Sequence, residues 1–145
     1  MIDRNHFVEW AEYLSKYYGT SELALMSPVT NSYNPIIELD VNAATKLIDY
    51  CDSHGIAYKD VFVLPLSKSQ FKSSVGEELA LKTIHERMIC RGRKNDLTPE
   101  QMKGRLKIAR TWLSKANDFN YLLENVTGGF SDAEVRLREI IESRV

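Results

Sequence analysis

The sequence has little cysteine. Its 145 residues include two cysteines, Cys51 and Cys90, which lie far apart and form no Cys-x-x-Cys pair. Structural zinc sites and redox-active dithiol motifs need closely spaced cysteines. The sequence therefore gives no support for either kind of site, and we expect both residues to be reduced thiols in the core or at its edge.

Long apolar runs are also absent. A helix that crosses a bilayer needs about 20 largely apolar residues, and the apolar runs of this chain are much shorter. The first ten residues, MIDRNHFVEW, lack the apolar stretch of a signal peptide. We therefore expect a cytoplasmic protein that has no membrane partner.

Local catalytic motifs are missing too. The histidines, His6, His54 and His85, have no second His or Cys at metal-ligand spacing. The sequence contains no His-Glu-x-x-His, Gly-x-Ser-x-Gly or phosphate-cradling Gly-Lys-Ser/Thr pattern. We expect no metal, no cofactor and no catalytic residue, and we favour a non-enzymatic protein. An active site assembled from distant residues would leave no local motif.

Hydrophobic periodicity predicts a mainly α fold. Apolar residues at three- and four-residue steps are typical of amphipathic helices, and Thr98, Pro99 and Gln101 form the start of one such helix, with a capping box. Ser131 and Glu134 predict a second capping box. We expect about five helices, at residues 3–19, 42–54, 75–90, 98–126 and 131–145.

Two short apolar segments, residues 36–39 and 60–64, are candidates for a two-stranded β element. The second segment is rich in β-branched and aromatic residues, which favour strands, and Pro65 follows it. A length of 145 residues suits one domain with a single core. We therefore predict one compact helical domain over residues 1–145.

Positive charge is concentrated in one stretch. The formal net charge is -1, yet residues 82–115 contain ten Lys or Arg and three Asp or Glu. On a helix, Lys103, Lys107 and Arg110 would project from one face. Such a face, with the loop before it, could neutralise several phosphates of DNA or RNA. The candidate nucleic-acid-binding residues are Arg91, Arg93, Lys94, Lys103, Lys107 and Arg110.

Two other interpretations of this stretch stay open. It is either the solvated face of ordinary helices or a contact for an acidic protein partner. Arg105 falls inside the apolar arc of its helix, where it could stack on an aromatic ring or mark a partner surface. Interface cores favour Trp, Tyr and Arg. A protein-interaction adaptor or inhibitor would therefore use Tyr17, Tyr18, Arg105, Trp112 and Tyr121.

One segment resembles a known family. Glu9 to Ile56 is similar to the helix, turn, Asn-Pro, helix and Gly arrangement of tailed-phage small terminase subunits, through Trp10, the Asn34-Pro35 pair, Leu47, Gly55 and Ile56. The resemblance implies a helical, ring-forming protein that binds viral DNA for packaging by a large ATPase and nuclease subunit.

Our leading hypothesis is a nucleic-acid-binding accessory or regulatory protein. A protein-interaction adaptor or inhibitor and a phage DNA-recognition subunit are the alternatives. The oligomeric state is left open.

Overall fold

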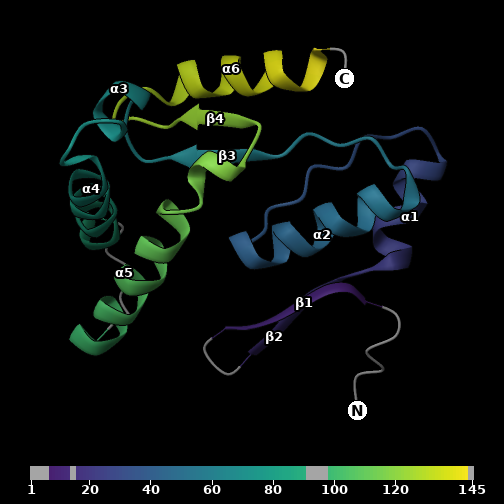
Figure 1. Ribbon diagram of the computed structural model, residues 1–145, viewed down its shortest axis with the longest axis horizontal. Helices are drawn as coiled ribbons and strands as arrows, with labels where there is room; N and C mark the ends of the chain where they lie inside the picture. The colour runs from purple at the N-terminus through teal and green to yellow at the C-terminus, as the bar shows by residue number, and fades with distance from the viewer. Residues whose placement is uncertain (1–6, 14–15, 91–97, 144–145) are drawn as a thin grey trace. The chain divides into compact units, whose positions relative to one another are not determined.

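The computed structural model describes residues 7–13, 16–90 and 98–143. By their internal contacts these residues form two compact units, Met1–Tyr58 and Lys59–Val145, each with a small sheet of its own (Figure 1). Whether the two units form one domain depends on how they are joined, so the single domain expected from the sequence stays a prediction.

An antiparallel hairpin opens the first unit. Strand β1 covers Phe7–Tyr13 and strand β2 covers Lys16–Ser21. Gly19 allows the two strands to approach, because a Cβ atom at this position would lie 2.7 Å from the backbone oxygen of Glu9. Aromatic residues, which are frequent in both segments, suit the pleated surface of a sheet. The helix predicted for residues 3–19 is therefore wrong.

Two helices follow the hairpin. Helix α1 covers Glu22–Thr30 and begins after Ser21, whose hydroxyl accepts a hydrogen bond from a backbone N–H of the first turn. Helix α2 covers Val41–His54, and the carboxylate of Asp40 caps its start in the same way. Gly55 ends α2 in the left-handed conformation, with φ 64°. The helix predicted from residue 42 to 54 is confirmed, whereas α1 lies in a segment for which no helix was predicted.

A parallel sheet of two strands organises the second unit. Strand β3, Val61–Leu64, pairs with strand β4, Tyr121–Glu124. Asp60 fixes the start of the sheet, since its carboxylate accepts hydrogen bonds from the backbone N–H and the side-chain amide of Asn120. The strand predicted at the first of these positions is confirmed. Its predicted partner, residues 36–39, is wrong.

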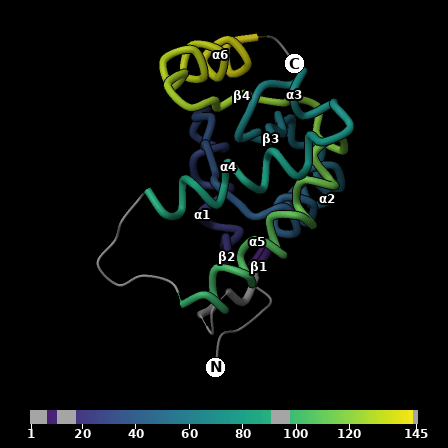
Figure 2. Tube along the Cα trace, turned by 90° about the vertical axis from the view of Figure 1, so that its left-hand side faces the viewer, coloured from purple at the N-terminus to yellow at the C-terminus, as the bar shows by residue number. Residues whose placement is uncertain are grey.

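Four α-helices of the second unit accompany this sheet. They are α3 (Lys68–Phe71), α4 (Gly76–Cys90), α5 (Pro99–Leu113) and α6 (Phe130–Glu142). The buried cluster of the unit joins α4 and α5 to the end of β3, and it contains Leu66, Ala80, Leu81 and Leu113. Helix α6 runs beside β4 in both views of the backbone (Figures 1 and 2).

The ends of two helices differ in how well the sequence predicts them. The capping box of Thr98 and Gln101 starts α5, as expected. The helix ends at Leu113 rather than near residue 126, because a short 3-10 turn and then β4 follow. Helix α6 starts after Gly129 with no side-chain cap, so the second predicted capping box is wrong.

The mainly α fold class is wrong, because the helices accompany one antiparallel and one parallel sheet. The parallel sheet brings together strands that are separated by two long helices, and this arrangement is typical of mixed α and β folds. In the part of the chain that the structure describes, we find no helix with the length and apolar character to cross a bilayer.

Candidate functional site

One face of the β1–β2 hairpin carries the candidate site. Thr20 lies opposite Glu9 in the strand register, and directly opposed residues of antiparallel strands project on the same side. Tyr18, two residues before Thr20, lies on that side too, because side chains alternate along a strand. We call Glu9, Tyr18 and Thr20 the hairpin face.

Glu9 is the buried acid of this face. Among the residues whose burial the structure describes, it is the one polar residue in the buried class, with 4% exposure. The hydroxyl of Thr20 donates a hydrogen bond to its Oε1 over 2.7 Å. Burying a carboxylate is costly unless donors reach it, and a carboxylate can accept about four hydrogen bonds. Thr20 uses one part of that capacity, so Glu9 is suited to accept further hydrogen bonds from a ligand.

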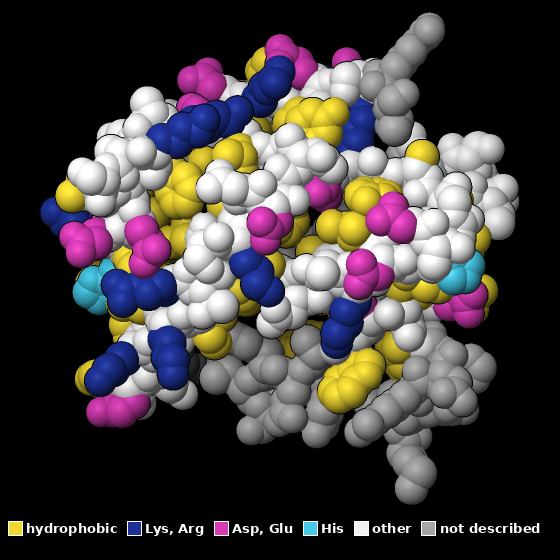
Figure 3. Space-filling model, in the orientation of Figure 1, with side chains coloured by type: hydrophobic (Ala, Val, Ile, Leu, Met, Phe, Trp, Pro, Cys, Tyr) yellow, Lys and Arg dark blue, Asp and Glu magenta, His cyan; other side chains and the backbone are white. Residues whose placement is uncertain are grey.

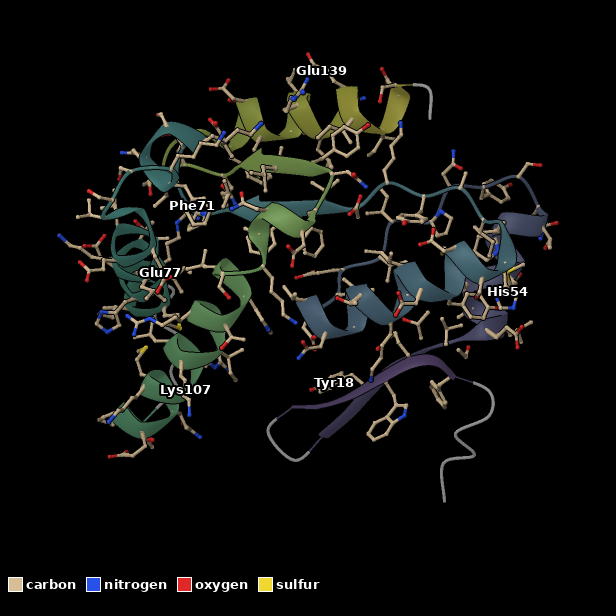
Figure 4. All side chains as sticks on the ribbon, in the orientation of Figure 1. Tyr18, His54, Phe71, Glu77, Lys107 and Glu139 are labelled. Atoms are coloured by element: carbon tan, nitrogen blue, oxygen red, sulfur yellow. The ribbon has the colours of Figure 1, made fainter. Side chains whose placement is uncertain are left out.

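Gly19 explains how Thr20 reaches Glu9. It lies opposite Trp10, and a Cβ atom there would be 3.1 Å from the Cβ of Trp10 as well as 2.9 Å from the ring of Phe7. A glycine in a strand often marks such a close approach. Tyr18, on the other side of Gly19, is 56% exposed, and Figure 4 labels it on the hairpin. The face therefore combines a buried acid with an accessible phenol.

Helix α2 is tied to the hairpin by Lys46. The Nζ of Lys46 donates a hydrogen bond to the backbone oxygen of Trp10 over 3.1 Å and lies 5.6 Å from the centre of the indole ring. A cation at this distance from an aromatic ring is attracted to its face. The contact holds β1, the strand that carries Glu9, against helix α2.

Two titratable groups of α2 favour their neutral forms. Partial burial raises the pKa of the Tyr50 phenol, and Glu22, which accepts a hydrogen bond from it over 2.9 Å, raises that pKa further. Burial also raises the pKa of the Cys51 thiol, with a smaller contribution from Asp52. A nucleophilic cysteine needs a lowered pKa. Cys51 therefore has the character of a structural thiol.

A second polar group lies at the carboxyl ends of β3 and β4. The guanidinium of Arg87 donates hydrogen bonds to the backbone oxygens of Pro65, over 3.1 Å, and Asn125, over 2.5 Å. The Oε1 of Glu124 accepts one from the backbone N–H of Lys68 over 2.9 Å. We call Arg87 and Glu124 the strand-end pair. Ligands of open α/β sheets bind outside the carboxyl ends of the strands. The strand-end pair lies at this end of the parallel sheet.

The structure describes three of the six predicted basic residues. Arg91, Arg93 and Lys94 lie outside the described residues. Lys103 and Lys107 are exposed on α5, and the Nε of Arg110 lies 3.0 Å from a carboxylate oxygen of Glu77 on α4.

Figure 4 labels Glu77 and Lys107 on these neighbouring helices, and Figure 3 shows acidic side chains among the basic ones on this side of the molecule. Interleaved charges of this kind are typical of a solvated helix pair. Whether any of the predicted basic residues contacts a ligand stays a prediction.

The predicted partner contacts belong to different units. Tyr17 is in β2, although its side chain lies outside what the structure describes, and Tyr18 is part of the hairpin face. Arg105, Trp112 and Tyr121 are partly buried in the second unit. The structure therefore does not group the five residues within one unit, and their role as a partner surface stays a prediction.

Comparison with known proteins gives a consistent result. The chain is 26% identical to the guanylate kinase of Malacoplasma penetrans over 144 residues, which are 99% of this chain and 63% of that protein. It is 26% identical to the guanylate kinase of Idiomarina loihiensis over 97% of this chain and 56% of the relative. It is 27% identical to the guanylate kinase of Prochlorococcus marinus over 86% of this chain and 57% of the relative. No family model matches.

The chain spans about three-fifths of the length of the curated relatives it matches. The relatives nevertheless correct the hypotheses drawn from the sequence. The resemblance to phage small terminase subunits is wrong, because the similarity to guanylate kinases covers nearly the whole chain, including Glu9 to Ile56. The nucleic-acid-binding regulator, with DNA or RNA as its partner, is wrong for the same reason, and so are the adaptor and the phage DNA-recognition subunit.

Proposed function

We propose that this chain is the guanylate-binding part of an enzyme of the guanylate kinase type, and that the hairpin face recognises the guanine base. The observation that carries the proposal is the buried carboxylate of Glu9, which Thr20 holds on the side of the hairpin that also presents Tyr18. The name shared by the relatives supports guanylate as the ligand.

The chemistry of guanine suits a buried carboxylate. Guanine has two adjacent donors, the N1–H and the N2 amino group, on one edge of the ring, and a carboxylate has two acceptor oxygens to face them. Adenine has an acceptor, N1, beside its N6 amino group. One oxygen of Glu9 would then face a lone pair, and a buried polar group left without its donor strongly disfavours a ligand. The hairpin face is therefore expected to select guanine over adenine.

Tyr18 supplies the second contact of this proposal. Its phenol is both a donor and an acceptor of hydrogen bonds, and it lies about 7 Å along the strand from Thr20, at 3.3 to 3.4 Å per residue. A nucleotide whose base contacts Glu9 has its sugar and phosphate at such a distance from the base edge. We assign Tyr18 to this polar part of guanylate.

The proposal is confined to recognition of guanylate. Phosphoryl transfer depends on positioning the phosphates and on stabilising their charge, often by a glycine-rich loop with a Gly-Lys-Ser/Thr end. These 145 residues contain no such pattern. The cytoplasmic location expected from the sequence also stays a proposal.

Replacing Glu9 by glutamine tests the assignment. The Glu9→Gln variant keeps the shape of the side chain but presents an amide N–H₂ donor where guanine also presents donors. Hydrogen bonds to a charged group contribute about 1.5 to 3 kcal/mol, so we expect the affinity for GMP to fall by about 10- to 100-fold. Calorimetric titration of the full chain with GMP measures this directly.

A matched control separates recognition from charge. Glu38→Gln removes the same charge at an exposed position of the first unit, and we expect it to leave the affinity for GMP unchanged. Circular dichroism establishes that both variants are folded. The assignment fails if Glu9→Gln binds GMP as the parent chain does, or if Glu38→Gln weakens binding equally.

A further inference from the structure

Helix α2 packs against strand β1 (Figure 1), and two of its side chains hold the hairpin. Lys46 and Tyr50 are four residues apart, so they project from the same face of the helix. Lys46 contacts Trp10, the neighbour of Glu9 on β1. Tyr50 contacts Glu22, the residue that directly follows β2. One helix face is therefore linked to both of the chain segments that bring Thr20 to Glu9.

Lys46 binds the outer edge of β1. A Cβ atom at Gly19 would lie 2.7 Å from the backbone oxygen of Glu9, so that oxygen points towards β2. Successive carbonyl groups of a strand point to opposite edges. The oxygen of Trp10, which accepts a hydrogen bond from the Nζ of Lys46 over 3.1 Å, therefore points away from β2. An isolated hairpin of two strands is marginally stable at best, so this bond supports β1 on the edge that β2 does not occupy.

Tyr50 acts at the end of β2. Its hydroxyl donates a hydrogen bond to the Oε1 of Glu22 over 2.9 Å, two residues after Thr20. The phenol ring is stacked on the ring of His54, which Figure 4 labels on α2, with the ring centres 4.0 Å apart and the planes at 20°. Stacking of this kind limits the positions that the ring can take. The hydroxyl of Tyr50 is therefore directed at Glu22.

We propose that Lys46 and Tyr50 are positioning residues for guanine recognition. They hold β1 and the end of β2 so that Thr20 occupies one acceptor site of Glu9 and leaves the others for the base. The inference rests on the proposed function and deepens it, and neither side chain is assigned a contact with the nucleotide. Hydrogen bonds to a carboxylate form over a narrow range of distances, so a small shift of β1 against β2 would weaken recognition.

Calorimetric titration with GMP tests the role of Lys46. Lys46→Met keeps most of the aliphatic chain and removes the cation and the donor. We expect the affinity for GMP to fall about fivefold, since the contact of a cation with an aromatic ring at an exposed site corresponds to a factor of that order. Lys46→Arg keeps a cation and N–H donors, and we expect it to bind GMP as the parent chain does.

The hydroxyl of Tyr50 is tested in the same way. Tyr50→Phe removes one oxygen and keeps the ring, and we expect the affinity for GMP to fall about threefold. The matched controls are Tyr33→Phe and Lys72→Met, which change the same side chains at exposed positions. We expect both controls to bind GMP as the parent chain does, and circular dichroism establishes that all variants are folded.

A double-mutant cycle separates positioning from a general loss of structure. If Lys46 acts through Glu9, Lys46→Met weakens GMP binding in the parent chain and has no further effect in Glu9→Gln. A general loosening of the fold would weaken both chains equally. Hydrogen exchange gives a readout without nucleotide, because the amides of β1 and β2 should exchange faster in Lys46→Met, whereas those of β3 and β4 should not change.

The outcomes are distinct. The inference is overturned if Lys46→Met or Tyr50→Phe binds GMP as the parent chain does, if Lys46→Arg is as weak as Lys46→Met, or if the loss persists in Glu9→Gln. These results leave intact the binding of GMP by the parent chain and its loss in Glu9→Gln, so the proposed function survives them. A parent chain that binds no GMP overturns both.

Discussion

At the scale of single residues, the proposed recognition of guanylate depends on one buried carboxylate. Glu9 has 4% exposure and a hydrogen bond from Thr20. Acids are almost never fully buried unless they are paired, so a buried carboxylate with one hydrogen-bond donor among the described residues is a candidate for ligand binding. Hydrophobic periodicity cannot identify such a residue, because it assigns every acid to the solvent side. Gly19 beside Thr20, in an aromatic segment, was the available signal of a closely packed strand.

The two cysteines should differ in reactivity. Cys51 is buried and burial raises the pKa of its thiol, whereas Cys90 is exposed at the end of α4. Because the thiolate is the reacting form, we expect iodoacetamide at neutral pH to label Cys90 in the native chain and to label both cysteines in denaturant. Mass spectrometry of the peptides measures this. Native labelling of Cys51 at the rate of Cys90 would contradict the burial that the structure gives it.

At the scale of elements, local signals located some helix ends and missed three of the four strands that the structure describes. The Thr98 capping box and the end of the second helix at His54, before the left-handed Gly55, were correctly located because a cap depends on a few neighbouring residues. The hairpin sequence also has helical spacing, since Phe7, Trp10 and Ala11 recur at three- and four-residue steps. Strand β4 was hidden within a predicted helix. Its pairing with β3 joins segments about 60 residues apart, which no local pattern records.

Gly19 provides a test of the packing of the hairpin. In Gly19→Ala the new Cβ would lie 2.7 Å from a backbone oxygen. Strands must separate to relieve such a contact, so we expect a loss of about 1 to 3 kcal/mol in the free energy of unfolding, as for other overpacked sites. Denaturation followed by circular dichroism measures the change, and we expect GMP affinity to fall with it.

Gly104→Ala is the matched substitution. This glycine is inside α5 and a Cβ there would meet nothing within 4 Å. Alanine favours helices over glycine by about 0.5 to 1 kcal/mol, so this variant should be more stable than the parent. If Gly19→Ala were as stable as the parent, the close approach of β1 and β2 would be disproved.

At the scale of the whole molecule, composition misled the functional prediction. The excess of basic residues between 82 and 115 suggested nucleic acid, yet Arg110 is paired with Glu77, which precedes that stretch. Charge counts along the sequence do not include partners that folding brings from another helix. The function proposed instead depends on a residue pair, Glu9 and Thr20, that is eleven positions apart and is joined only by the hairpin.

The central claim is that the hairpin face recognises guanine. Side-by-side calorimetric titrations of the parent chain with GMP and with AMP test it most directly, because the two ligands differ in the base alone. We predict that GMP binds with one site per chain and that AMP binds at least about tenfold more weakly, since adenine leaves one oxygen of Glu9 without a donor. Equal affinities for the two nucleotides, or no binding of GMP, would contradict the account.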